Sequence, residues 1–142
     1  MHHAGETGGP DRVREALGVG RAERIGHGIR ALEDPELTAE LRDRQVPLEV
    51  CPGSNVALGL VPSLAAHPLP RLVAAGLAVT LNTDVPSITG RTLTDEYASV
   101  RSVFGAGDAE LARLAVAAVD ASFAPADTRR RIRAGIVGWL DA

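Results

Sequence analysis

The sequence predicts an α/β fold built on a parallel sheet. From Glu23 onward, short apolar runs alternate with longer amphipathic stretches, which is the pattern of repeated strand–helix units. Glycine and proline punctuate these stretches, with 15 Gly and 9 Pro in 142 residues. The chemically unusual polar residues follow the predicted strands, where parallel α/β folds gather their functional side chains.

The first two units lie in the N-terminal third of the chain. The first holds the end of a strand, residues 1–3, and then a glycine-rich turn and a helix over 10–17 that starts with proline. The second has a predicted strand at 22–25 and a helix that runs to about residue 44, with Asp34 as its N-terminal cap.

The third and fourth units complete the predicted sheet. A strand at 47–51 leads into a loop rich in glycine and proline, and a helix over 69–75 follows. Gly76 is expected to end that helix in a left-handed conformation, just before the last strand at 77–81.

Three helices are predicted after the sheet, over residues 93–103, 108–121 and 126–140. Apolar residues recur at helical spacing in all three, for example at Leu111, Leu114, Ala115 and Ala118, which indicates packing against the sheet. No linker composition interrupts the chain, so we predict a single domain over 1–142.

Composition excludes several classes of function. A net charge of −3 argues against nucleic-acid binding through bulk charge, and two Phe, one Tyr and one Trp give no stacking platform for single strands. No apolar run approaches the roughly 20 residues of a membrane-spanning helix. The single cysteine, Cys51, excludes an internal disulfide and favours a reducing compartment, so a cytoplasmic location is expected.

Four polar residues lie at the ends of predicted strands and could converge on one site. They are His3 and Glu6 at the end of the first strand, His27 at the end of the second and Asp84 at the end of the fourth, while residues 51–55 follow the third. Imidazole nitrogen and carboxylate oxygen together suit zinc, which lowers the pKa of a bound water to about 7. Glu6 could then serve as a general acid and His27 as a base or an orienting group. Taken one at a time, each residue could instead be a loop cap, but four at successive strand ends are hard to attribute to packing.

Three neighbouring residues have simpler interpretations. Cys51 is expected to be a buried strand-end residue rather than a nucleophile, since no basic neighbour in sequence would lower its pKa. His67, before Pro68, is expected to mark a helix start. Glu49 could orient His27, or it could lie at the surface or an interface.

Four sequence blocks occur in the order and spacing of the adenosine deaminase family. They are His3-Ala4-Gly5-Glu6, Arg24-Ile25-Gly26-His27-Gly28, Cys51-Pro52-Gly53-Ser54-Asn55 and Asn82-Thr83-Asp84. The chain therefore resembles the C-terminal half of a zinc-dependent (β/α)8 barrel of the amidohydrolase superfamily, with additional C-terminal helices.

The resemblance implies a role for each of the four polar residues. His3 and Asp84 would bind one zinc ion, Glu6 would protonate the purine ring at N1, and His27 would orient or deprotonate the attacking water. The implied reaction is hydrolytic deamination at C6 of adenosine or a related 6-aminopurine nucleoside, which releases ammonia.

Two substrate-contacting positions also follow from the resemblance, Gly5 and Val85. The family commonly places a second acidic residue after its metal-binding Asp, where it bonds the purine N7, and Val85 cannot make that bond. A site without the protein group that hydrogen-bonds the purine N7 binds a substrate with that nitrogen less favourably, because the nitrogen is left without a partner. This departure leaves a modified adenosine or another 6-aminopurine open as the substrate.

A second departure concerns the metal ligands. The family's first strand supplies a His-x-His pair, and nothing upstream of His2 is present in the sequence to supply it. Three interpretations stay open. The chain could be a fragment or a late-start form of an enzyme, a half-barrel that associates with another chain through unpaired strand edges, or a non-catalytic remnant.

Overall fold

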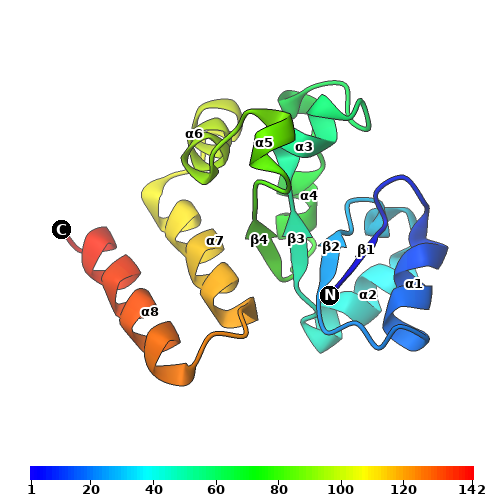
Figure 1. Ribbon diagram of the computed structural model, residues 1–142, viewed down its shortest axis with the longest axis horizontal. Coiled ribbons are helices and arrows are strands. Elements are labelled where there is room, and N and C mark those ends of the chain that lie inside the picture. The colour runs from blue at the N-terminus through cyan, green and yellow to red at the C-terminus, as the bar shows by residue number, and fades with distance from the viewer.

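The computed structural model describes residues 1–142, and its centre is a four-stranded sheet (Figure 1). All strand pairs are parallel, and the spatial order of the strands is the order of the sequence. The strands are β1 (His2–Ala4), β2 (Ile25–His27), β3 (Leu48–Val50) and β4 (Val79–Leu81). A parallel α/β sheet that adds each new strand beside the last confirms the predicted fold class.

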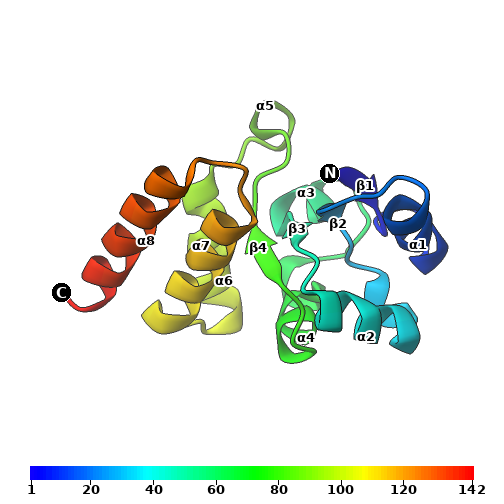
Figure 2. The ribbon, with the colours of Figure 1, turned by 90° about the horizontal axis from the view of Figure 1, so that it is seen from below.

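Helices connect the strands and continue the chain beyond β4. They are α1 (Pro10–Gly18), α2 (Pro35–Arg44), α3 (Pro52–Ala57), α4 (Leu69–Ala74), α5 (Pro86–Thr89), α6 (Leu93–Phe104), α7 (Asp108–Ala121) and α8 (Ala126–Leu140). Two short 3₁₀ turns, η1 (Ala31–Glu33) and η2 (Leu64–Ala66), precede α2 and α4. Figures 1 and 2 show α1 and α8 at opposite ends of the molecule.

Most predicted helices are found within a residue or two of their expected bounds. The Asp34 carboxylate accepts a hydrogen bond from the Leu37 amide and caps α2, as predicted. Gly76 has a φ of 76°, which confirms the left-handed turn expected after α4.

The predicted strand at 22–25 is wrong, because β2 spans Ile25–His27. The Ala22 amide still belongs to the end of the preceding helix, since it donates to the Ala16 carbonyl. Gly26 lies just beyond the predicted strand, yet it pairs with His3 on one side and Glu49 on the other. Pairing on both sides extends the strand through a glycine that would otherwise weaken it.

The helix α3 was not expected either. The Pro52-Gly53 sequence reads as a loop, but proline occupies the first turn of this helix, where its missing N–H costs no hydrogen bond. The consequence is structural: Ser54 and Asn55 lie on a helix that begins at the end of β3.

The core lies between the sheet and its helices and comprises one cluster of 22 buried residues. Each strand contributes to it, through Ala4, Ile25, Leu48 and Val79 among others. The strand register places Ala4 beside His27, and Val50 beside Leu81, so the carboxyl ends of all four strands meet at one edge.

The C-terminal helices follow β4, and two of them pack beside it. α6 and α7 contact β4, as predicted, whereas α8 contacts α7 and has no buried residue of its own, so the prediction that this last helix packs against the sheet is wrong. Arg24 anchors the turn between α7 and α8, since its guanidinium donates to the Ala121 carbonyl and lies 4.1 Å from the centre of the Phe123 ring. None of the helices has the length and apolar character that a membrane span requires.

Candidate active site

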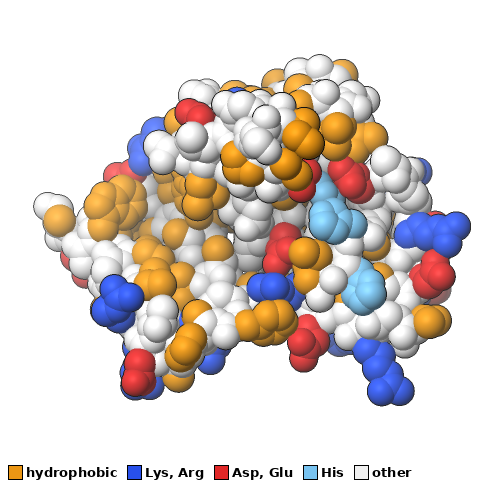
Figure 3. Space-filling view, viewed as in Figure 1, with side chains coloured by type: hydrophobic (Ala, Val, Ile, Leu, Met, Phe, Trp, Pro, Cys, Tyr) orange, Lys and Arg blue, Asp and Glu red, His pale blue; other side chains and the backbone are white.

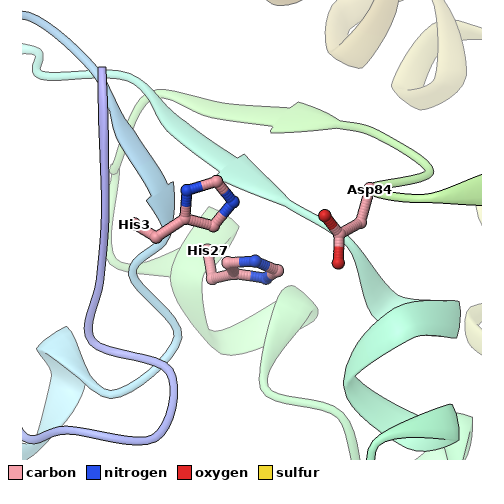
Figure 4. Close-up of side chains that lie close together, drawn as sticks. All are labelled: His3, His27 and Asp84. Carbon is pink, nitrogen blue, oxygen red and sulfur yellow. The ribbon is translucent and has the colours of Figure 1, made fainter.

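Three potential ligand side chains converge at the carboxyl edge of the sheet. His3 belongs to β1, His27 ends β2, and Asp84 lies three residues after β4. One ligand atom from each can be chosen so that all lie within 4.8 Å of one another, and Figure 4 shows the three side chains facing a common space. The sequence-based expectation that these strand ends share one site therefore agrees with the geometry.

Two of these residues have unusual backbone geometry. The φ angles of His27 and Asp84 are 65° and 62°, in the left-handed region that costs a non-glycine residue roughly 1–2 kcal/mol. Such conformations persist where the surrounding structure holds them, and they cluster at functional positions. The turn at each strand end thus directs the side chain toward the shared space.

Glu6 lies beside this group. Its Oε2 is 3.5 Å from His27 Nε2, and its Oε1 is buried without a hydrogen-bond partner. A buried carboxylate oxygen without a partner is costly unless something else contacts it, so this oxygen is suited to a ligand.

Gly5 shapes the turn that delivers Glu6. Its φ is 65°, and a Cβ atom there would lie 2.6 Å from Val13 Cγ2 and 3.2 Å from the Gly28 Cα. Only glycine satisfies both the backbone angle and the close approach of the chain after β2.

Ser54 orients the Asp84 carboxylate. The Ser54 hydroxyl donates to Asp84 Oδ2 over 2.6 Å, and Ser54 is buried on α3. Because one carboxylate oxygen is held in this way, the other remains available toward His3 and His27.

Asn55 and His67 lie behind His27. Asn55 Nδ2 is 3.2 Å from His27 Nδ1, and His67 Nε2 is 3.1 Å from Asn55 Oδ1. The backbone N–H of Leu69 donates to His67 Nδ1 over 3.0 Å, which confirms that His67 marks the start of α4. Its second bond, to Asn55, was not expected from the sequence.

Burial dominates the electrostatics of the site. Loss of solvent lowers the pKa of His27 below its ordinary value, although the carboxylates of Glu6 and Asp84 act in the opposite direction. The same effect raises the pKa of the Cys51 thiol to about 12, and the carboxylate of Asp84 adds to it. Cys51 is buried and uncharged, as predicted, and has no nucleophilic character.

Two open hollows meet at His3. One, of about 390 Å³, is lined by His3, His27, Cys51 and Asp84 among others. The second, of about 490 Å³, is lined by His3, Gly5 and Glu6 and extends toward α1. Figure 3 shows histidine side chains next to acidic ones on this face of the molecule. The candidate ligands and the candidate acid are therefore reached from adjoining spaces.

Two other predicted residues lie at the margin. Val85 is 40% exposed and precedes α5 without any side-chain hydrogen bond. Glu49 Oε1 is 3.2 Å from the Arg24 Nε, so its ion pair is with Arg24 and it makes no hydrogen bond to His27.

Sequence reasoning identified the four convergent residues but missed three that hold them. Ser54, Asn55 and His67 are each buried and hydrogen-bonded to the site or to one another. Two of them stand in the quoted block after β3, and a signal was present: a serine and an asparagine directly after a buried strand are unusual for a core helix.

The fold and the side chains at its strand ends define a class. A parallel α/β sheet that gathers His, Asp and Glu at its carboxyl edge has the composition of a metal-assisted hydrolase site. Comparison with known proteins then specifies the family. The adenosine deaminase family model matches residues 1–139, so the chain belongs to the adenosine deaminase family.

Curated relatives carry several deaminase names. The chain is 45% identical over 134 residues to an adenine deaminase of Rhizobium johnstonii, covering 94% of this chain and 42% of that protein. It is 48% identical over 130 residues to an aminodeoxyfutalosine deaminase of Streptomyces coelicolor, covering 92% of this chain and 34% of that protein. The chain thus spans well under half the length of these relatives.

Solved structures agree with the fold. An adenine deaminase from Arthrobacter aurescens superposes with a TM-score of 0.96 at 40% identity, covering 99% of this chain and 43% of that one. An amidohydrolase from Burkholderia ambifaria with bound Zn gives a TM-score of 0.86 at 26% identity, covering 98% and 39%. The four strand–helix units therefore correspond to part of the larger fold of these relatives.

Proposed function

We propose that the chain carries part of the active site of a hydrolase that removes the 6-amino group of a purine. The observation that carries this proposal is the cluster of His3, His27 and Asp84 within 4.8 Å, with Glu6 beside His27, in a chain of the adenosine deaminase family. Relatives named for adenine, adenosine and aminodeoxyfutalosine support a 6-aminopurine as the substrate class.

The donor atoms fit zinc. One imidazole and one carboxylate, from His3 and Asp84, provide nitrogen and oxygen ligands of the kind zinc prefers, and Ser54 already fixes the second Asp84 oxygen. We propose that these two residues hold one zinc ion, together with ligands that this chain does not contain. When bound, zinc supplies an acidified water at neutral pH.

Glu6 is proposed to deliver a proton to the purine ring. Its Oε1 is buried and has no partner within the chain, so it is free to contact a ring nitrogen. Protonation of N1 makes C6 more electrophilic, which favours attack by water and loss of ammonia. His27, with Nε2 on the side of Glu6, would orient or deprotonate that water.

Gly5 and Val85 are proposed to contact the substrate. The Gly5 backbone forms the turn next to Glu6, and Val85 presents an exposed apolar side chain beyond Asp84. A valine cannot pair with the purine N7, so selection among 6-aminopurines must depend on other contacts.

The edges of the sheet suggest a protein partner. β1 and β4 each pair on one side only, and such edges are templates for further strands. We propose self-association, or pairing with the remaining strands of a barrel, through these edges. Light scattering on a size-exclusion column tests the first option, and a monomer at all concentrations would contradict it. We further propose a cytoplasmic location, because the one cysteine is a buried free thiol.

The decisive experiment couples metal content to ammonia release. Zinc is added to the chain, its stoichiometry is measured, and ammonia is assayed with adenine, adenosine and N6-substituted adenosines. Glu6→Gln should lower ammonia release about 10²–10⁴-fold and leave zinc content unchanged, as expected for a general acid. Asp84→Asn should lower zinc content itself. Stoichiometric zinc without ammonia from any purine would reject catalysis by this chain alone.

A further inference from the structure

Three hydrogen bonds link a backbone amide to the histidine of the candidate site. The Leu69 N–H donates to His67 Nδ1 over 3.0 Å, His67 Nε2 lies 3.1 Å from Asn55 Oδ1, and Asn55 Nδ2 lies 3.2 Å from His27 Nδ1. Asn55 is fully buried and His67 is 3% exposed, so water does not compete for these bonds.

The backbone amide sets the direction of the whole series. An N–H group can only donate, so His67 Nδ1 carries no proton, and the neutral ring must carry its proton on Nε2. The ring is neutral at pH 7, since burial lowers the pKa of His67 to about 4. His67 Nε2 then donates to Asn55, and this identifies the acceptor as the amide oxygen.

The same reasoning continues to His27. With its oxygen toward His67, the Asn55 amide presents its NH₂ group to His27 Nδ1. Turning the amide over would set its NH₂ group against the protonated His67 Nε2, and two buried donors facing each other leave groups unsatisfied at a cost of about 1–3 kcal/mol each. His27 Nδ1 is therefore an acceptor.

We propose that Asn55 and His67 are positioning residues that hold His27 with its only ring proton on Nε2. That nitrogen lies 3.5 Å from Glu6 Oε2, on the side of the space shared with His3 and Asp84. His27 consequently presents an N–H donor to the attacking water proposed above, so of the two roles it can orient that water but cannot deprotonate it. Its one lone pair, on Nδ1, is engaged by the Asn55 amide. The tautomer follows from the hydrogen bonds alone, and its catalytic meaning rests on the proposed function.

The tautomer is measured by NMR on the chain labelled with 15N-histidine. The chain has four histidines, and His2→Gln, His3→Gln and His67→Gln assign three of the rings directly and the His27 ring by elimination. Long-range 1H–15N correlations at pH 7 should show a protonated Nε2 and an unprotonated Nδ1 for both His27 and His67. A His27 ring protonated at Nδ1 would overturn the proposal, whatever the outcome of the ammonia assay.

Asn55→Asp replaces the NH₂ donor that faces His27 Nδ1 with an acceptor oxygen and keeps nearly the same side-chain shape. A carboxylate accepts from both rings, so the His27 proton should move to Nδ1 while His67 keeps its own on Nε2. Gln45→Glu is the matched control, because it makes the same change of charge at the exposed end of α2 and should leave both rings unchanged. An unchanged His27 tautomer in a folded Asn55→Asp variant would contradict the proposal.

Zinc itself provides a second readout. Added to the wild-type chain, zinc should shift the His3 ring resonances and leave the His27 Nε2 proton in place. Loss of that proton on zinc addition would show that His27 is a ligand and would also overturn the proposal. These signals do not depend on turnover, so failure of deamination and failure of the tautomer assignment are distinguishable.

Discussion

Replacing Gly53 with alanine should strain the contact between α3 and α6. A Cβ atom at Gly53 would lie 2.1 Å from Glu96 Oε1 and 2.3 Å from Arg91 Nε. Glu96 is fully buried, and its carboxylate accepts hydrogen bonds from the Gly53 N–H over 3.0 Å and from Arg91 Nε over 2.6 Å. The carboxylate cannot move away from a new methyl group without weakening both bonds.

The magnitude follows from two overlapping effects. Overpacking a filled site costs about 1–3 kcal/mol. Weakening a buried hydrogen bond to a charged group costs about 1.5–3 kcal/mol. A shift of Glu96 that relieves the overpacking also weakens its hydrogen bonds, so the two costs overlap and do not add in full. We therefore expect Gly53→Ala to lower the free energy of unfolding by about 3 kcal/mol.

Urea denaturation followed by circular dichroism measures this change. Gly135→Ala is the matched control, since nothing lies within 4 Å of a Cβ at that position in α8, and alanine there should stabilise by about 0.5–1 kcal/mol. Equal stabilities for Gly53→Ala and the wild type would refute the steric argument.

Two further predictions concern buried titratable groups. The pKa of Cys51 is about 12 in the folded chain, so a thiol reagent at pH 8 should react only after denaturation. The free energy of unfolding should fall as the pH rises above about 9, because the unfolded thiol then loses its proton and the folded one does not. Rapid labelling of the native chain would contradict this burial. The pKa of His67 is lowered to about 4, so below the ordinary value of about 6.5 the unfolded chain binds a proton that the folded chain does not. Stability should fall by up to roughly 3 kcal/mol between pH 6.5 and pH 4, and His67→Gln should remove that part of the acid limb in equilibrium denaturation.

The sequence is sufficient to place the four convergent side chains. His3 ends the predicted strand at residues 1–3, His27 and Asp84 follow the predicted second and fourth strands, and parallel pairing brings the carboxyl ends of these strands to one edge. The prediction placed the start of β2 three residues too early, but this did not affect the placement of His27. What matters for that placement is that His27 lies at the carboxyl end of the strand, not how long the strand is.

Contacts between distant parts of the chain could not be predicted. Gly53 and Glu96 are separated by 43 positions, and the bond between them depends on how α6 packs over α3. The hydrogen bond between Asn55 and His67 spans 12 positions across a loop without a regular period. Local propensity and periodicity carry no information on such pairs, which only tertiary packing brings together.

The left-handed backbone at His27 and Asp84 limits how substitutions there can be interpreted. Asn, Asp and His are the non-glycine residues that tolerate this conformation best. Asp84→Glu would therefore impose a backbone penalty before any change in ligand reach is felt, whereas Asp84→Asn would not. A loss of zinc in the Asp84→Glu variant would therefore combine a backbone effect with any effect on metal coordination. At this position the left-handed backbone restricts which residues are tolerated, independently of whether their side chains can bind a metal.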